Sequence, residues 1–319
     1  MIPRTPVRVF ALAFAVLFFV AACGGPAAPT ASPSPSGPVS YEGWPPAASY
    51  ELIPIPVSSE LVVGPNRLLV NLIDNANEPI AAEDRPVTFR LFDLAQDDAT
   101  AKSETDATYM PTIEGRPGLY RAQVEFDRAG DWGLEAVTTE PDGSQRTGRM
   151  IFAVRESGST PGIGDPAPAS DTPTAATDAE VAAISTDDDP DADFYRLSIA
   201  DALEADQPFV VAFATPAFCR TATCGPTLDV VKAVADFHKD RINFVHVEPY
   251  ELEAVDGGLQ PVLSDQNLPI SVPATNEWGL PTEPYVFVVD AAGNISAKFE
   301  GIAAADELEA ALESVAGDG

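Results

Sequence analysis

Two stretches rich in proline, alanine, serine and glycine constrain the fold of this 319-residue chain more than any other feature of its sequence. The first covers residues 23–46. The second runs from about residue 156 to residue 191 and includes the acidic run at 187–189. Chains of this composition bury too little apolar surface to form a core, and they are typical of flexible linkers. The sequence therefore predicts two folded domains of ordinary size, at 47–155 and 192–319.

The first 22 residues have the pattern of an export signal. Arg4 and Arg8 precede an uncharged apolar run over residues 9–22, which is too short to cross a bilayer comfortably. The run ends in Val20-Ala21-Ala22-Cys23, which resembles the lipobox of bacterial lipoproteins. The resemblance implies that Cys23 is acylated and becomes the mature N-terminus, so that lipid anchors the chain to the extracytoplasmic face of the cell membrane. An ordinary secretory signal with an Ala-x-Ala site is the alternative.

The charge of the chain excludes one class of partner. The formal net charge is -31, and the signal carries two arginines and no acid, so the mature chain is near -33 (-31 minus 2). Such a surface repels nucleic acid and anionic lipid headgroups. We therefore expect no binding to DNA or RNA.

The first folded segment has the pattern of an all-β domain. Short apolar runs predict strands near residues 61–63, 68–73, 87–92, 120–126, 132–137 and 150–154. Apolar and polar residues alternate in 120–126, which is typical of a sheet covered on one side. Short strands at this spacing resemble an immunoglobulin-like β-sandwich, in which Trp132 is expected to anchor the core. The segment contains no histidine or cysteine, so a soft-metal site is not expected, and we interpret it as a spacer or partner-binding module.

The second folded segment alternates strands and helices. Residues 208–214 are continuously apolar, which predicts a central strand buried on both faces, and the apolar residues of 226–239 fall on one helical face. Further strands are predicted at 242–247, 285–289 and 294–299, with a final helix at 306–315. This order matches a thioredoxin-like core. The expected fold class is therefore multidomain, with an N-terminal all-β sandwich followed by a C-terminal α/β thioredoxin-like domain.

Two cysteines lie where the first of these strands passes into the helix. An aromatic residue precedes Cys219, and Cys224-Gly225-Pro226 opens the helix, which resembles the redox turn of thioredoxin-family enzymes. A helix N-terminus favours a thiolate over a thiol. The resemblance also implies a cis-proline before the third strand, facing the dithiol, for which Pro284 is the better candidate and Pro281 the second. The implied catalytic residues are Cys219, Cys224 and Pro284, without a metal ion or cofactor.

The cysteine spacing departs from the usual Cys-x-x-Cys of that family. Cys219 and Cys224 enclose four residues, and on a regular helix their side chains would point about 140° apart. Cys219 must therefore lie in a loop if the two are to bond. A different alignment places Thr227 where the resolving thiol would be, so the sequence leaves open which cysteine attacks. A permanent disulfide that clamps the loop is the alternative, since exported pairs usually oxidise.

Three weaker candidates are His238, His246 and Glu248. His238 is expected to be partly covered near the last carbonyls of its helix. His246 and Glu248 share one face of a strand whose end approaches the dithiol in this fold. Extracytoplasmic copper chaperones of the thioredoxin superfamily bind metal with two cysteines and a histidine, but residues 260–277, where their histidine lies, contain none here.

Three functions remain open on the sequence alone. The first is a membrane-anchored enzyme that exchanges thiols and disulfides with exported proteins through Cys219 and Cys224. The second is a non-catalytic binding or scaffold lipoprotein with a structural disulfide. The third, least favoured, is a copper carrier.

Overall fold

The computed structural model describes residues 41–44, 52–113, 115–140 and 142–317. Cys23, the export signal and most of the first expected linker lie outside these residues. Residues 40–319 belong to one compact unit. No helix in the described part of the chain is long and apolar enough to cross a membrane.

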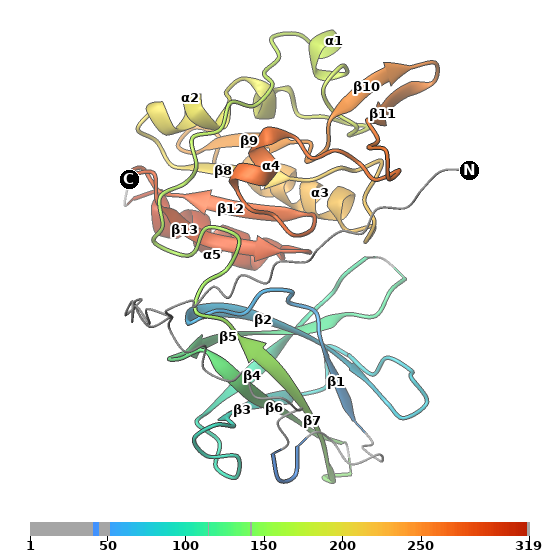
Figure 1. The fold of residues 1–319 in the computed structure, drawn as a ribbon, viewed down its shortest axis with the longest axis vertical. Helices are drawn as coiled ribbons and strands as arrows, with labels where there is room; N and C mark the ends of the chain where they lie inside the picture. The colour runs from blue at the N-terminus through green and yellow to red at the C-terminus, as the bar shows by residue number, and fades with distance from the viewer. Residues whose placement is uncertain (1–40, 45–51, 114, 141, 318–319) are drawn as a thin grey trace, which may run out of the picture. The chain divides into compact units, whose positions relative to one another are not determined.

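The N-terminal half forms a single antiparallel sheet of seven strands in the order β1-β2-β5-β4-β3-β6-β7 (Figure 1). The strands are β1 (Ile53–Pro56), β2 (Gly64–Ile73), β3 (Val87–Asp93), β4 (Ser103–Met110), β5 (Leu119–Phe126), β6 (Gly130–Thr139) and β7 (Gln145–Val154). The two ends of the sheet approach each other, because Val63 donates its N–H to Arg155 O at 2.9 Å and Arg155 donates its own to Leu61 O at 2.9 Å. The sheet is therefore nearly closed.

Alternating side chains of this sheet fill one core. Tyr120, Ala122, Val124 and Phe126 of β5 are all buried, as the alternation in the sequence predicts. Trp132 of β6 packs edge-on against Phe126 with ring centroids 4.8 Å apart, so it is the core anchor that was expected.

The C-terminal half contains a four-stranded sheet in the order β13-β12-β8-β9. Its strands are β8 (Phe209–Phe213), β9 (Asn243–Val247), β12 (Tyr285–Val289) and β13 (Ile295–Glu300). Strands β8 and β9 are parallel, and the other pairs are antiparallel. A separate hairpin joins β10 (Leu252–Val255) to β11 (Gly258–Pro261).

Every residue of β8 is buried, because helices cover both of its faces. Val210 and Ala212 pack with residues of α3 (Cys224–Ala235) and α5 (Ala305–Val315). Val211 and Phe213 face the opposite way and pack with residues of α2 (Ile199–Glu204) and α4 (Pro273–Glu277). This packing fixes the end of β8, from which the cysteine loop leaves.

The expected fold class, an all-β sandwich followed by an α/β thioredoxin-like domain, is wrong. The structure is mostly β, with 36% strand and 16% helix, and its described residues contain no clear thioredoxin-like α/β domain with central helices. The seven N-terminal strands join one sheet instead of two facing sheets. An alternating pattern shows which face of a strand is buried but leaves its pairing partner open.

The segment expected as the second linker, residues 156–191, packs along the second sheet. Gly164 donates its N–H to Ile295 O at 2.8 Å, and Ile295 donates to Asp165 O at 2.9 Å. Farther along, the segment forms the short helix α1 (Asp178–Val181). The same segment then brings Thr186 to Glu248, which follows β9, and Ser185 to Tyr195, whose hydroxyl also contacts His246 of β9.

Candidate functional site

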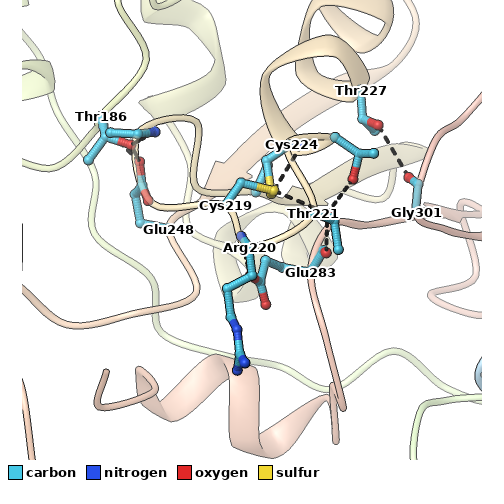
Figure 2. The surroundings of a disulfide bond; sticks show 12 residues. Thr186, Cys219, Arg220, Thr221, Cys224, Thr227, Glu248, Glu283 and Gly301 are labelled. Atoms are coloured by element: carbon cyan, nitrogen blue, oxygen red, sulfur yellow. Dashed lines mark hydrogen bonds between the residues drawn. A yellow bond between two sulfur atoms is a disulfide. The ribbon is translucent and has the colours of Figure 1, made fainter. Parts of the chain in front are cut away.

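A disulfide joins Cys219 to Cys224 where the chain passes from β8 into α3 (Figure 2). Cys224 is the first residue of α3, and Cys219 lies in the preceding loop. Their Cα atoms are 5.8 Å apart, within the usual range for a disulfide. The two cysteines can bond although four residues separate them, because Cys219 lies in the loop and only Cys224 lies in the helix.

The two cysteines differ in their access to solvent. Cys224 is completely buried in the core beneath α3, whereas Cys219 is partly exposed. An incoming sulfur can therefore approach Cys219 more easily than Cys224.

One backbone N–H donates to the Cys219 sulfur, and a threonine hydroxyl lies close to it. The Cys224 N–H donates to Cys219 Sγ at 3.1 Å, and Thr221 Oγ1 lies 3.4 Å from the same sulfur. Thr221 Oγ1 is also 2.6 Å from Thr223 Oγ1. In the reduced protein, donors at a helix N-terminus favour the thiolate and lower the pKa of a cysteine. This arrangement suits Cys219 as the nucleophile.

The segment before β12 contacts the cysteine loop. The Glu283–Pro284 peptide is cis, so the cis-proline is Pro284, the better of the two predicted candidates, and not Pro281, the second. Thr221 Oγ1 donates to Glu283 O at 3.5 Å, and the Arg220 N–H donates to Glu283 Oε1 at 3.4 Å (Figure 2). Pro284 thus lies directly before β12 and directly after a residue that holds the loop.

The carboxylate of Glu283 is a buried part of the site that sequence reasoning missed. The Tyr250 hydroxyl donates to Glu283 Oε2 at 2.8 Å. Burial, together with the nearby carboxylate, raises the pKa of Tyr250, so its hydroxyl keeps its proton. The only sequence signal for Glu283 was its position before Pro284, and nothing marked Tyr250.

His246 lies in β9 and contacts the end of β8. Its Nε2 is 3.0 Å from the carbonyl of Ala214, and its Nδ1 is 2.7 Å from the Tyr195 hydroxyl. Complete burial lowers the pKa of His246, although Glu248 opposes the shift. The neutral ring donates from Nε2 to the carbonyl and accepts at Nδ1 from Tyr195, whose oxygen is also 2.8 Å from Ser185 Oγ.

Glu248 is tied to the cysteine loop through Thr186. Its Oε1 accepts hydrogen bonds from the Thr186 N–H at 2.7 Å and from the Thr186 hydroxyl at 2.6 Å. Thr186 Oγ1 in turn accepts from the Ala217 N–H at 3.2 Å. His246 and Glu248 therefore support the two ends of the segment that leads to Cys219, without contacting its sulfur.

The remaining candidates contribute less to the site. His238 is buried just after α3, and its backbone carbonyl accepts from the Arg241 and Ile242 N–H groups. Within the described residues, no cluster of three or more histidine, cysteine, aspartate or glutamate side chains could hold a metal ion. The copper-carrier hypothesis thus has no ligand set in that part of the chain.

Comparisons with known proteins do not assign this site. No protein-family model matches the chain. No curated protein matches it either.

Proposed function

We propose that this protein exchanges thiols and disulfides with exported proteins through Cys219 and Cys224. The observation that carries the proposal is the asymmetry of the pair: a partly exposed sulfur receives a hydrogen bond from the first N–H of a helix, and its partner is buried. Reactive cysteines are typically accessible to solvent and lie close to a source of positive potential, such as a helix N-terminus. Cys219 is the attacking residue in this proposal, and Cys224 is the resolving one.

The exchange balances without any cofactor. The Cys219 thiolate attacks one sulfur of a substrate disulfide, which forms a mixed disulfide and releases the other substrate sulfur as a thiolate. Cys224 then loses its proton to solvent and attacks the Cys219 sulfur, which releases the second substrate thiolate. The substrate disulfide gains two electrons and the cysteine pair loses two. The reverse path oxidises a substrate dithiol.

Trapping of mixed disulfides tests the proposal. Cys224→Ser should accumulate mixed disulfides with exported proteins, because the resolving thiol is missing, whereas Cys219→Ser should trap far less. The double variant is the matched control and should trap nothing. The reduction potential of the wild-type pair should lie above about −300 mV, in the range of catalytic pairs. A pair far below that value, with no trapped partner, would contradict the proposal.

A second candidate is a binding or scaffold lipoprotein with a permanent disulfide. The complete burial of Cys224 favours it, because a buried sulfur is protected from reductants. The same measurement of reduction potential separates the two candidates.

We also propose that the mature chain is held at the extracytoplasmic face of the membrane by lipid on Cys23. The support comes from the sequence, in which Cys23 directly follows an apolar run that ends in two small residues. Export also suits a cysteine pair that must oxidise to act.

A further inference from the structure

The carboxylate of Glu283 lies beside the peptide bond that follows Cys219. Glu283 is only 7% exposed, and its Oε1 accepts the Arg220 N–H at 3.4 Å (Figure 2). Because that N–H belongs to the peptide bond after Cys219, covalent geometry keeps the carboxylate oxygen within about 9 Å of the Cys219 sulfur. A buried acid therefore lies close to the sulfur that attacks in the proposed exchange.

Tyr250 holds this carboxylate from its other oxygen. The Tyr250 hydroxyl donates to Oε2 at 2.8 Å, so both oxygens of Glu283 accept hydrogen bonds, as the oxygens of an ionised carboxylate do. Among the residues that the structure describes, no lysine or arginine forms an ion pair with Glu283. Its negative charge is thus fixed in position and is not cancelled by a contacting cation.

The other charged groups around Cys219 are exposed or are held elsewhere. Arg220 is exposed, and its side chain points away from the disulfide in Figure 2, so water and salt screen its charge. The first turn of α3 carries no acidic residue. Glu248 is buried, but its hydrogen bonds go to Thr186. Glu283 alone among these groups is both buried and hydrogen-bonded to the residue after Cys219.

Two opposing effects act on the Cys219 thiol in the reduced protein. The Cys224 N–H at the start of α3 lies 3.1 Å from Cys219 Sγ and favours the thiolate. A negative charge nearby disfavours the thiolate, and buried charges are screened less than exposed ones. The disulfide has no charge to repel, so the carboxylate destabilises only the reduced pair, which lowers the reduction potential.

We propose that Glu283 is a positioning residue whose buried charge disfavours the Cys219 thiolate and so biases the exchange towards reduction of substrate disulfides. The inference rests on the proposed function. Each turnover breaks the substrate disulfide, moves two electrons to it and joins Cys219 to Cys224. A partner dithiol then returns two electrons to the pair and is itself oxidised to a disulfide.

The pH dependence of alkylation by iodoacetamide measures the thiolate directly. Cys23→Ser and Cys224→Ser leave Cys219 as the sole thiol of the full chain, which contains three cysteines. In this background the pKa of Cys219 should be at least about 7.5, above the range of about 3.5–7.5 for cysteines activated by a helix N-terminus or a cation. A lower pKa would overturn the inference, and this measurement requires no change at Glu283.

Glu283→Gln removes the charge and keeps an oxygen that can accept a hydrogen bond. In the single-thiol background it should lower the pKa of Cys219 by at least about 0.5. With both cysteines present, the equilibrium with glutathione at pH 9 should shift about threefold towards the dithiol, which corresponds to a reduction potential higher by about 14 mV. The alkylation rate at high pH should fall by less than about twofold, because a thiolate of lower pKa is a weaker nucleophile.

Two control variants separate the charge of Glu283 from its support of the loop. Glu251→Gln removes an exposed carboxylate next to Tyr250 and should leave the pKa of Cys219 within about 0.2 of its value. Tyr250→Phe loosens the hold on Glu283 but keeps its charge, so the pKa should not fall. An unchanged pKa in Glu283→Gln, or an equal fall in Tyr250→Phe, would overturn the inference.

Alkylation requires no exchange partner, so this inference and the proposed function can fail separately. A lower pKa in Glu283→Gln without any trapped mixed disulfide would support the effect of Glu283 and contradict the exchange function. Trapped partners together with an unchanged pKa would overturn the inference about Glu283 and leave the exchange function standing.

Discussion

At the scale of single residues, His246 connects the protonation state of the protein to the segment that carries Cys219. Its neutral ring bridges Tyr195 and the carbonyl of Ala214 in the interior. Burial lowers the pKa of the ring below the ordinary value near 6.5 that it regains on unfolding. Between the two pKa values the unfolded chain binds more protons, so stability must rise with pH there.

We therefore expect the free energy of unfolding to fall as the pH is lowered below about 6.5, by up to about 1.4 kcal/mol per pH unit. Urea unfolding between pH 5.5 and 7.5 measures this slope. His246→Gln should be less stable overall but should lose most of the slope. His238→Gln removes the other histidine of the chain and is the control that should keep it. A slope that persists in His246→Gln would show that another group causes it.

The sequence predicted the site residues that lie at recognisable positions along the chain, at the ends of predicted strands and helices. Cys219, Cys224 and Pro284 stand next to strand and helix ends, and the structure brings the cysteine loop and the residue before Pro284 into contact. Glu283 and Tyr250 escaped notice because their hydrogen bond joins positions 33 residues apart. Periodicity and motif spacing carry no information about such a pairing.

At the scale of elements, a buried ion pair links β2 to α5. Arg67 donates from Nε to Glu307 Oε1 at 2.9 Å and from Nη2 to Oε2 at 2.6 Å. Arg121 of β5 adds a second cation 2.7 Å from Glu307 Oε2. The Arg67 and Glu307 side chains are only 7% and 12% exposed, so loss of the carboxylate would leave two arginines poorly solvated.

Glu307→Gln should accordingly lower the free energy of unfolding by about 3 kcal/mol. Chemical denaturation followed by circular dichroism measures the change. Glu309→Gln alters an exposed position of the same helix and should stay within about 0.5 kcal/mol of wild type. Equal stabilities for the two variants would mean that the ion pair contributes nothing.

The positions of helices and strands were easier to predict than the contacts that they make. Strands β8, β9, β12 and β13 lie within two residues of their predicted positions, because their apolar runs are short and bounded by turn residues. Helix α3 ends at Ala235, four residues before its predicted end at Lys239. Trp44 lies inside the first expected linker, yet it is buried against Phe92 with ring centroids 5.1 Å apart. A single aromatic residue in a proline-rich stretch gives no periodic signal.

At the scale of the whole molecule, the membrane location that we propose depends on Cys23. Cys23→Ala should release the chain from the membrane fraction or leave the signal unprocessed, because the acylated thiol would be absent. Cell fractionation followed by mass spectrometry of the N-terminal peptide measures both outcomes. Cys219→Ser removes another thiol and should leave the anchor unchanged. An unacylated Cys23 in the wild-type membrane fraction would refute the lipid anchor.

The fold class was wrong at this scale because it required the pairing of strands far apart in sequence. Strand β2 pairs with β5, and β3 pairs with both β4 and β6, so the sheet order departs from the chain order. Alternation within each strand is the same whether the strands form one curled sheet or two facing sheets. Six strands were predicted in this segment and seven form the sheet: β1 and β4 were missed, and the run at 61–63 is not one of the seven strands.

Near closure of the seven-stranded sheet also governs how copies of this protein behave when crowded together. Exposed sheet edges offer unpaired N–H and C=O groups to neighbouring chains and promote aggregation. Here the residues just before β2 and just after β7 bond to each other across the gap, through the hydrogen bonds of Val63 and Arg155 with each other and of Arg155 with Leu61. Residues 164–167 pair in the same way beside the start of β13. In the lipid-anchored state that we propose, copies would meet at high local density, and hydrogen bonds already formed at these two places would disfavour intermolecular sheets there.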